Sequence, residues 1–154
     1  MGSHLGRWLG LGLLLLGCSV DKGQDFQVAE AVFDEGFFYC QVEPMLFAQG
    51  CGSGDPAQGE DGRGCHFSVT AFRLTDYGPP YVGDQCSGNV PDVGPSAQAK
   101  SNYSSAQLFM DRDPDRAQLL QRPTHTTAHP RVVIQPASAQ ADLIRQWATL
   151  FSTR

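Results

Sequence analysis

Two cysteines and a histidine in the first half of the chain have the residue types that attach a haem. Cys65 is followed directly by His66, and Cys51 lies upstream, with thirteen residues between the two cysteines. In a c-type haem site each thiol adds to a vinyl group of the porphyrin, and the adjacent histidine is the fifth ligand of the iron. The usual spacing is two residues, but closing a longer flexible loop adds only about 0.6 kcal/mol per doubling of its length. The pattern is therefore compatible with haem attachment at Cys51 and Cys65, with His66 as the proximal ligand.

Another cysteine ends an apolar segment near the N-terminus. Arg7 precedes a run of leucines and glycines that closes with Leu15-Leu16-Gly17-Cys18. This is the layout of a secretory signal, and the run is too short to span a bilayer as a stable helix. Its last four residues resemble the lipobox of bacterial lipoproteins.

The lipobox resemblance implies that residues 1–17 are a signal peptide and that Cys18 becomes a lipidated N-terminus. Residues 18–25 are then a tether, and residues 26–154 form a single domain. We expect a protein anchored by lipid in the bacterial cell envelope. Ser19, the residue after the lipidated cysteine, favours the outer membrane, with the domain facing the periplasm or the cell surface.

Export would place the remaining four cysteines in an oxidising compartment, where an even number of thiols tends to pair. Cys40 and Cys86 are expected to form one disulfide. An alternative to haem is a second disulfide between Cys51 and Cys65, which would close the glycine-rich loop and contribute roughly 2 to 4 kcal/mol. His66 would then be an ordinary surface histidine.

A third possibility is a zinc or copper site that combines His125 and His129 with Cys65 and His66. The spacing of four residues would put the two later histidines on one face of a helix. The threonines and proline around them instead favour a polar turn.

Segments on both sides of the Cys-His pair resemble small bacterial c-type cytochrome domains. The run Val42-Glu43-Pro44-Met45-Leu46, followed by Cys51 and then Cys65-His66, resembles the helix that leads into their haem motif. Residues 105–123 resemble the segment before a later histidine, and residues 143–150 resemble the closing helix. The resemblance implies a mainly α, cytochrome c-like domain with haem c as its cofactor. Long loops rich in glycine and proline would be stabilised by one or more disulfides.

The second axial ligand of such a haem would come from the later half of the chain. Met110, His125 and His129 are the candidates. The family's late histidine matches His129 best, whereas Met110 stands beside Leu108 and Phe109 in an expected helix, where a methionine more often fills a core.

These features favour a carrier of one electron or a redox module over an enzyme. The alternative is a haem-free lipoprotein with two disulfides, which keeps the cytochrome-like scaffold as an interaction module or accessory subunit of an envelope complex. Either protein would meet the membrane through its lipid anchor and a redox or envelope protein through its domain.

Composition excludes several other classes of function. The 154 residues carry a formal net charge of -5, which gives no electrostatic footprint for nucleic acid. No phosphate-binding loop, nucleophile motif or suitably placed carboxylate pair is visible. Asp111, Asp113 and Asp115 alternate in a short region where they are expected to begin helices rather than bind calcium.

The elements that must position these residues can be predicted from periodicity and capping signals. We expect a helix over residues 26–49, interrupted at Gly36 and Pro44, and a short extended piece over residues 67–74. Cys86 should order the loop over residues 78–96. Short helices should follow Ser104-Ser105 and Asp113-Pro114, the second ending at Pro123. An amphipathic helix should begin near Ser138, with one apolar face made by Leu143, Ile144, Trp147, Leu150 and Phe151.

Overall fold

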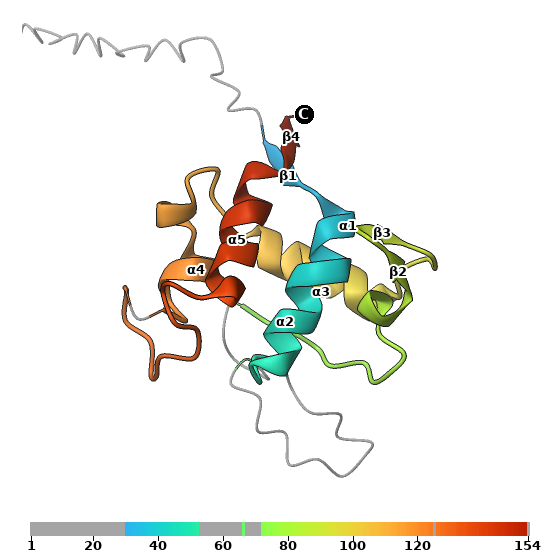
Figure 1. Ribbon diagram of the computed structural model, residues 1–154, viewed down its shortest axis with the longest axis horizontal. Helices are drawn as coiled ribbons and strands as arrows, with labels where there is room; N and C mark the ends of the chain where they lie inside the picture. The colour runs from blue at the N-terminus through green and yellow to red at the C-terminus, as the bar shows by residue number, and fades with distance from the viewer. Residues whose placement is uncertain (1–29, 53–65, 67–71, 125, 154) are drawn as a thin grey trace, which may run out of the picture.

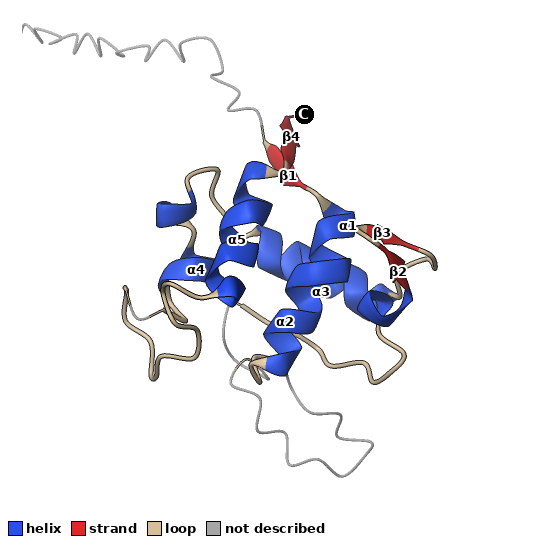
Figure 2. Cartoon of the chain, viewed as in Figure 1, coloured by secondary structure: helices blue, strands red, loops and turns tan. Residues whose placement is uncertain are grey.

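The computed structural model describes residues 30–52, 66, 72–124 and 126–153. About 45% of these residues are helical, and the strands are few and short, so the expected mainly helical class is confirmed. Figures 1 and 2 show helices crossing around a common centre, with two small two-stranded sheets at the periphery. The predicted signal peptide, the tether, Cys65 and His125 lie outside the described residues.

The first helical segment is continuous but changes its pitch. It comprises α1 (Glu35–Phe37), the π-helical turn η1 (Phe38–Val42) and α2 (Glu43–Ala48). Asp34 caps its start, because its Oδ1 accepts a hydrogen bond from the backbone of Phe37 at 2.6 Å. The buried face carries Phe37, Phe38, Val42 and Leu46.

Two expectations for this segment are wrong. The helix begins at Glu35 rather than near Phe26, and Gly36 lies inside its first turn instead of interrupting it. Pro44 also lies in a first turn, that of α2, where a missing backbone N–H is tolerated. The irregularity is the π-helical turn between them, a feature that side-chain periodicity does not reveal.

A small antiparallel sheet joins the two ends of the described chain. β1 (Ala31–Phe33) pairs with β4 (Phe151–Thr153), with Ala31 opposite Thr153 and Phe33 opposite Phe151. Phe151 therefore belongs to a strand and is 40% exposed, which corrects its expected place on the last helix.

The long helix α3 (Ala97–Gln107) starts earlier than predicted. Ser96 is its N-cap, accepting a hydrogen bond from the backbone of Ala99 at 3.1 Å. Ser104 and Ser105, expected to cap a helix, lie within its last turns. Ser104 donates back to the carbonyl of Lys100 at 3.0 Å, and Ser105 accepts from the backbone of Arg73 at 2.9 Å. The expectation of a helix start at Ser104-Ser105 is wrong because α3 ends there.

The aspartates after α3 do begin helices. Asp113 caps η4 (Pro114–Arg116), a single 3-10 turn, by accepting from the backbone of Asp115 at 3.1 Å. Asp111 accepts in turn from the backbone of Asp113 at 2.9 Å. η4 leads into α4 (Gln118–Gln121), which ends before Pro123 as predicted.

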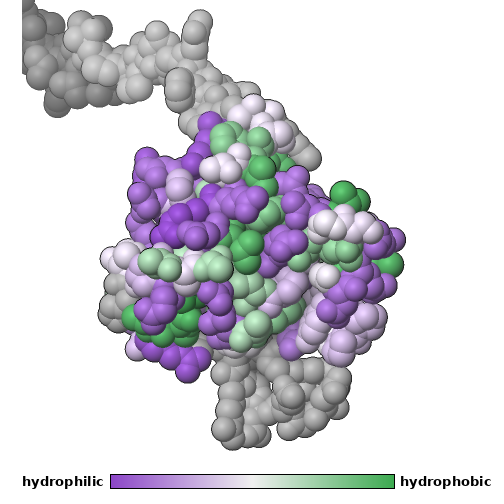
Figure 3. All heavy atoms as spheres, viewed as in Figure 1, coloured by the Kyte–Doolittle hydropathy of each residue, from purple (hydrophilic) through white to green (hydrophobic). Residues whose placement is uncertain are grey.

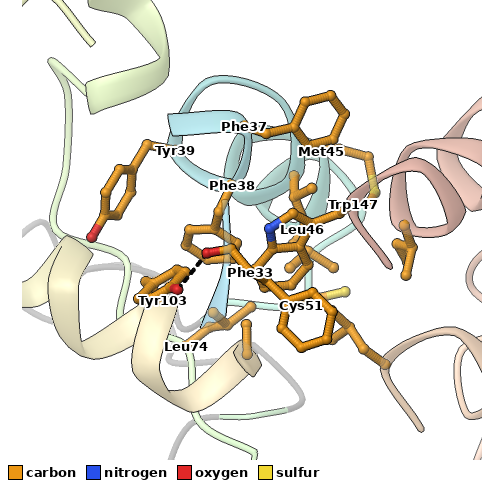
Figure 4. Close-up of a cluster of buried hydrophobic side chains, with 14 of the residues drawn as sticks. Phe33, Phe37, Phe38, Tyr39, Met45, Leu46, Cys51, Leu74, Tyr103 and Trp147 are labelled. Atoms are coloured by element: carbon orange, nitrogen blue, oxygen red, sulfur yellow. Dashed lines mark hydrogen bonds between the residues drawn. The ribbon is translucent and has the colours of Figure 1, made fainter. Parts of the chain in front are cut away.

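The last helix, α5 (Ala139–Thr149), confirms the clearest prediction from the sequence. Ser138 is its N-cap, and Asp142 lies in its first turn. Trp147 has no exposed surface, and its indole N–H donates to the carbonyl of Asp34 at 2.8 Å. Its ring lies 5.1 Å from that of Phe38, between centroids. Figure 4 shows this aromatic cluster, which fastens α5 to η1.

The segment between Phe72 and Ser96 is held by a disulfide rather than by regular structure. Phe72–Leu74, the described part of the expected extended piece, is not in a β-strand. The short 3-10 helix η3 (Val82–Gln85) precedes a hairpin of β2 (Cys86–Ser87) and β3 (Val90–Pro91). The predicted Cys40–Cys86 disulfide is present, and it ties this hairpin to η1.

Gly83 shows how closely η3 approaches the first helix. A Cβ at this position would stand 2.3 Å from Cγ of Pro44 and 3.1 Å from the carbonyl oxygen of Tyr39. Only a glycine lets the two backbones pack at this distance.

The surface is mostly polar. On the face drawn in Figure 3, hydrophilic residues predominate and apolar residues form small, separate groups. Among the described helices, none has the length and apolar character needed to cross a membrane.

Candidate functional site

An apolar cavity of about 230 Å³ lies where the end of α2 meets α4 and the segment after it. Its described walls come from six separate stretches of the chain between residues 46 and 133. The described lining residues are Leu46, Gln49, Gly50, Cys51, His66, Phe72, Phe109, Gln118, Leu119, Arg122, Pro123, Ala128, His129, Pro130, Arg131 and Val133. The cavity therefore brings together three of the residues singled out from the sequence: Cys51, His66 and His129.

The turn that ends α2 places Cys51 in the wall of the cavity. Gly50 has a φ of 69°, the left-handed conformation that commonly terminates helices. The backbone N–H of Cys51 then donates to the carbonyl of Leu46 at 3.0 Å, which closes the turn. The side chain of Cys51 is buried, with 7% of its surface exposed.

His66 is half-buried and lies against Phe72. The two ring centroids are 4.8 Å apart, with an edge-to-face arrangement. Burial lowers the pKa of His66 below its ordinary value, and the nearby His129 and Arg122 add to this effect, while a hydrogen bond with the backbone of Phe72 opposes it. The imidazole is therefore neutral at pH 7, the form in which a histidine binds a metal.

His129 lines the cavity and its ring is stacked beside that of His66. The centroids of the two rings are 6.2 Å apart, and their planes are inclined by only 27°. Nδ1 of His129 lies 2.6 Å from the carbonyl oxygen of Arg131. Since a carbonyl can only accept, Nδ1 carries the hydrogen, and Nε2 is the nitrogen of the neutral ring with a free lone pair.

The charged residues among those described as lining the cavity are both arginines. They are Arg122 and Arg131, and no carboxylate is among the described lining residues. An apolar cavity with guanidinium groups in its lining suits an apolar ligand that carries an anionic group.

No protein-family model matches the chain, and no significant match was found among curated proteins or solved structures. Its function must be argued from its own residues.

The structure separates the candidate ligands. Met110 packs against the hydrophobic core and is not among the described residues that line the cavity. His129 lies on the cavity wall. Within the described part of the chain, no three histidine, cysteine, aspartate or glutamate side chains gather into a metal-binding group. The zinc or copper interpretation also used Cys65 and His125, which lie outside the described residues.

Sequence reasoning did not find the two arginines or the aromatic walls made by Phe72 and Phe109. These residues come from separate loops, and no spacing in the sequence links them to the Cys-His pair. Glu43 was also missed, although a signal was present: it is a carboxylate on a helix face otherwise made of Tyr39, Val42 and Leu46.

Proposed function

We propose that this protein is a cytochrome c-like electron carrier or redox module, held at the bacterial cell envelope by lipid on Cys18. Haem c would be attached through Cys51 and Cys65, with His66 and His129 as its axial ligands. When bound, the haem would supply reversible transfer of one electron.

The observation that supports this proposal is that His66, His129 and Cys51 line one apolar cavity. An imidazole nitrogen lies about 2 Å from a metal that it binds, so two rings on opposite sides of one ion have centroids about 6 Å apart. The ring centroids of His66 and His129 are 6.2 Å apart, close to this value, and the rings are stacked. Binding one ion between them would turn a nitrogen of each ring toward it. Met110, the other described candidate, packs against the core and is not among the described residues that line the cavity.

The surroundings of both histidines also suit ligands. A ligating histidine usually donates its other N–H to a backbone carbonyl or carboxylate, which fixes the orientation of the ring. His129 does so with Arg131, and His66 has a hydrogen bond with the backbone of Phe72.

The size of the cavity favours a second candidate function. A volume of about 230 Å³ is below the roughly 300–1,000 Å³ of typical ligand sites. The described walls would therefore enclose only part of a porphyrin. The alternative is a haem-free lipoprotein in which Cys51 pairs with Cys65 and the domain serves as an accessory or interaction subunit.

The expected lipid anchor and the cavity would lie at opposite ends of the molecule. Figure 1 shows β1 and β4 at one end and the C-terminal end of α2, where the cavity lies, at the other. Because the lipid-bearing segment precedes β1, the anchor would join the domain at the end opposite the cavity.

The decisive experiment is a visible spectrum and an intact mass of the mature protein, produced without its signal in a periplasm that contains haem-maturation machinery. A Soret band with the added mass of one haem is expected. His129→Ala should then change the spectrum through loss of a ligand, and Met110→Ala should not. No Soret band, with a mass lower by four hydrogens, would mean two disulfides and would support the haem-free candidate.

The anchor is tested separately. Cys18→Ala in the full-length chain should abolish lipid attachment and leave an unprocessed precursor. Unchanged incorporation of labelled fatty acid would refute the lipid anchor without affecting the haem proposal.

A further inference from the structure

Glu43 is a buried carboxylate outside the cavity that interacts with both α3 and the segment leading from Phe72. It has no exposed surface. Its Oε2 accepts a hydrogen bond from the hydroxyl of Tyr77 at 2.9 Å, and its Oε1 accepts from Nδ2 of Asn102 at 2.8 Å. These two bonds connect α2, which carries Glu43, to a loop and to α3.

Asn102 extends the connection to the backbone of Thr75. Its Oδ1 accepts from the N–H of Thr75 at 2.7 Å, and its Nδ2 also donates to the carbonyl of Thr75 at 2.8 Å. The hydroxyl of Tyr77 accepts in turn from the N–H of Val82 at 3.2 Å. The network centred on Glu43 therefore fixes the backbone of residues 75–77 and the start of η3.

The same segment forms a wall of the cavity. Phe72, three residues before Thr75, lines the cavity and packs against both His66 and Phe109, with ring centroids 4.8 and 5.4 Å apart. Leu74, between them, is fully buried. Residues 72–77 thus form a short, packed piece of chain that joins the Glu43 network to the cavity wall.

The groups that face Glu43 do not neutralise its charge. Asp76 and Tyr77 face it from the loop, Tyr39 from η1, and the uncharged Asn102 from α3. Burial raises the pKa of Glu43 to about 7; the hydrogen bonds from Asn102 and Tyr77 lower it, and the charge of Asp76 raises it further. The carboxyl would exchange its proton in the range where envelope compartments operate.

We propose that Glu43 is a positioning residue for the cavity, whose bound proton keeps residues 72–77 packed against α2 and α3. When Glu43 is protonated, the proton is carried on Oε2, which then donates to the Tyr77 hydroxyl, while Oε1 still accepts from Asn102. Loss of the proton leaves a buried negative charge that faces no cation among the described residues. That charge is relieved when the segment opens and water reaches the carboxylate. Opening moves the Phe72 wall and the support of His66. The inference concerns the cavity itself and does not depend on what occupies it.

Hydrogen exchange at the amide of Thr75 tests the first step. The mature protein is followed from pH 5 to pH 8.5, with each rate divided by the intrinsic rate at that pH. The opening equilibrium constant should rise by up to about two orders of magnitude, with a midpoint near pH 7. In Glu43→Gln it should stay near its low-pH value throughout. Glu35→Gln, on the same helical segment but outside the network, should behave like the wild type.

Two further variants keep the test decisive if Glu43→Gln does not fold. Asp76→Asn removes the charge that raises the pKa of Glu43, so the midpoint should move to lower pH. Tyr77→Phe removes a hydrogen bond that stabilises the ionised form, so the midpoint should move to higher pH. A flat profile in the wild type, or the same profile in all variants, would overturn the proposal.

Nuclear magnetic resonance of Phe72 tests the second step. Its signals should shift with the same midpoint as exchange at Thr75, and this component should vanish in Glu43→Gln while the titration of His66 itself remains. If exchange at Thr75 depends on pH and the signals of Phe72 do not, Glu43 stabilises only its immediate surroundings and the proposed coupling to the cavity is wrong. Neither readout needs haem, so its failure is distinguishable from failure of the redox proposal.

Discussion

Tyr39 and Tyr103 belong to one aromatic cluster, but their hydroxyl groups have opposite surroundings. The ring centroids are 6.0 Å apart. The hydroxyl of Tyr103 donates to the carbonyl of Phe33 at 2.6 Å and also contacts Oε1 of Gln107. The hydroxyl of Tyr39 is buried and has no hydrogen-bond partner among the described residues. Burial and the nearby carboxylates of Glu35 and Glu43 raise its pKa, so it remains neutral.

Removing these two hydroxyls should therefore have unequal effects on stability. Tyr39→Phe deletes a buried hydroxyl that makes no hydrogen bond with the described residues. The free energy of unfolding should therefore stay the same or rise by up to about 1 kcal/mol. Tyr103→Phe leaves the Phe33 carbonyl without its donor and should cost about 1 to 3 kcal/mol. Urea denaturation followed by circular dichroism measures both. Equal losses in the two variants would mean that Tyr39 has a bound water or another partner.

Glu43 gives the fold a distinct dependence on pH. Its pKa is 4.5 in the unfolded chain and about 7 in the fold, so folding favours the protonated form. The resulting stabilisation is fully present below pH 4.5, declines as the pH rises, and is lost above about pH 7. Relative to Glu43→Gln, the wild type should lose on the order of 2 kcal/mol across this interval.

The unfolding free energy of the wild type must be compared with that of Glu43→Gln, because the titration of His66 also makes stability depend on pH and does so in the opposite sense. Its lowered pKa costs stability as the pH falls below its ordinary value of 6.5. Both proteins keep His66, so the difference between their unfolding free energies at each pH isolates Glu43. A constant difference from pH 4.5 to pH 8 would show that Glu43 titrates normally in the fold.

At the scale of elements, the two serine positions on α3 distinguish a cap from an internal residue. Ser96 satisfies a backbone N–H at the start of the helix, whereas Ser104 returns its hydroxyl to a carbonyl within it. Ser96→Ala should cost about 1 kcal/mol. Ser104→Ala should be neutral or stabilising by a few tenths of a kcal/mol, since alanine has the higher helix propensity. Thermal and urea unfolding compare them directly, and a larger loss at Ser104 would place the helix start where the sequence suggested.

The element boundaries show which local signals were reliable. Ser138 and Asp113 were identified correctly as N-caps, because the residues that directly follow each of them are enough to predict a helix start. Ser104-Ser105 has the same residue types, but α3 already occupies these positions. Its apolar residues are small, such as Ala99 and Ala106, so the helix has little amphipathic pattern to detect. Packing, rather than periodicity, sets its register.

At the scale of the whole molecule, the Cys40–Cys86 disulfide holds a loop with little core of its own. The two cysteines are 46 residues apart in sequence. For a closed loop of this length, the entropy model predicts a stabilisation of about 4 kcal/mol. The double variant Cys40→Ala with Cys86→Ala should lose a comparable amount, measured by urea unfolding.

The disulfide prediction has an internal control. The intact mass of the double variant reports whether Cys51 and Cys65 keep their chemical state, so a loss of stability can be assigned to the missing bridge. If stability falls by less than about 1 kcal/mol, the contacts of η3 with α2, including that of Gly83 with Pro44, hold the loop without it.

The sequence by itself determined the helical class, the α4 region and α5, because capping side chains, prolines and an apolar face act within a few residues. The Cys40–Cys86 bridge was predicted on a different ground, the pairing of an even number of cysteines after export. The sequence also identified Cys51, His66 and His129 as candidate ligands or attachment sites. Only the tertiary structure decided that these three share one cavity, that Met110 packs against the core and that Arg122 and Arg131 line the cavity. It alone paired β1 with β4 and buried Glu43 between α2, α3 and a loop. Such contacts depend on how distant segments pack, and burial changes the chemistry of a residue in ways that no local pattern records.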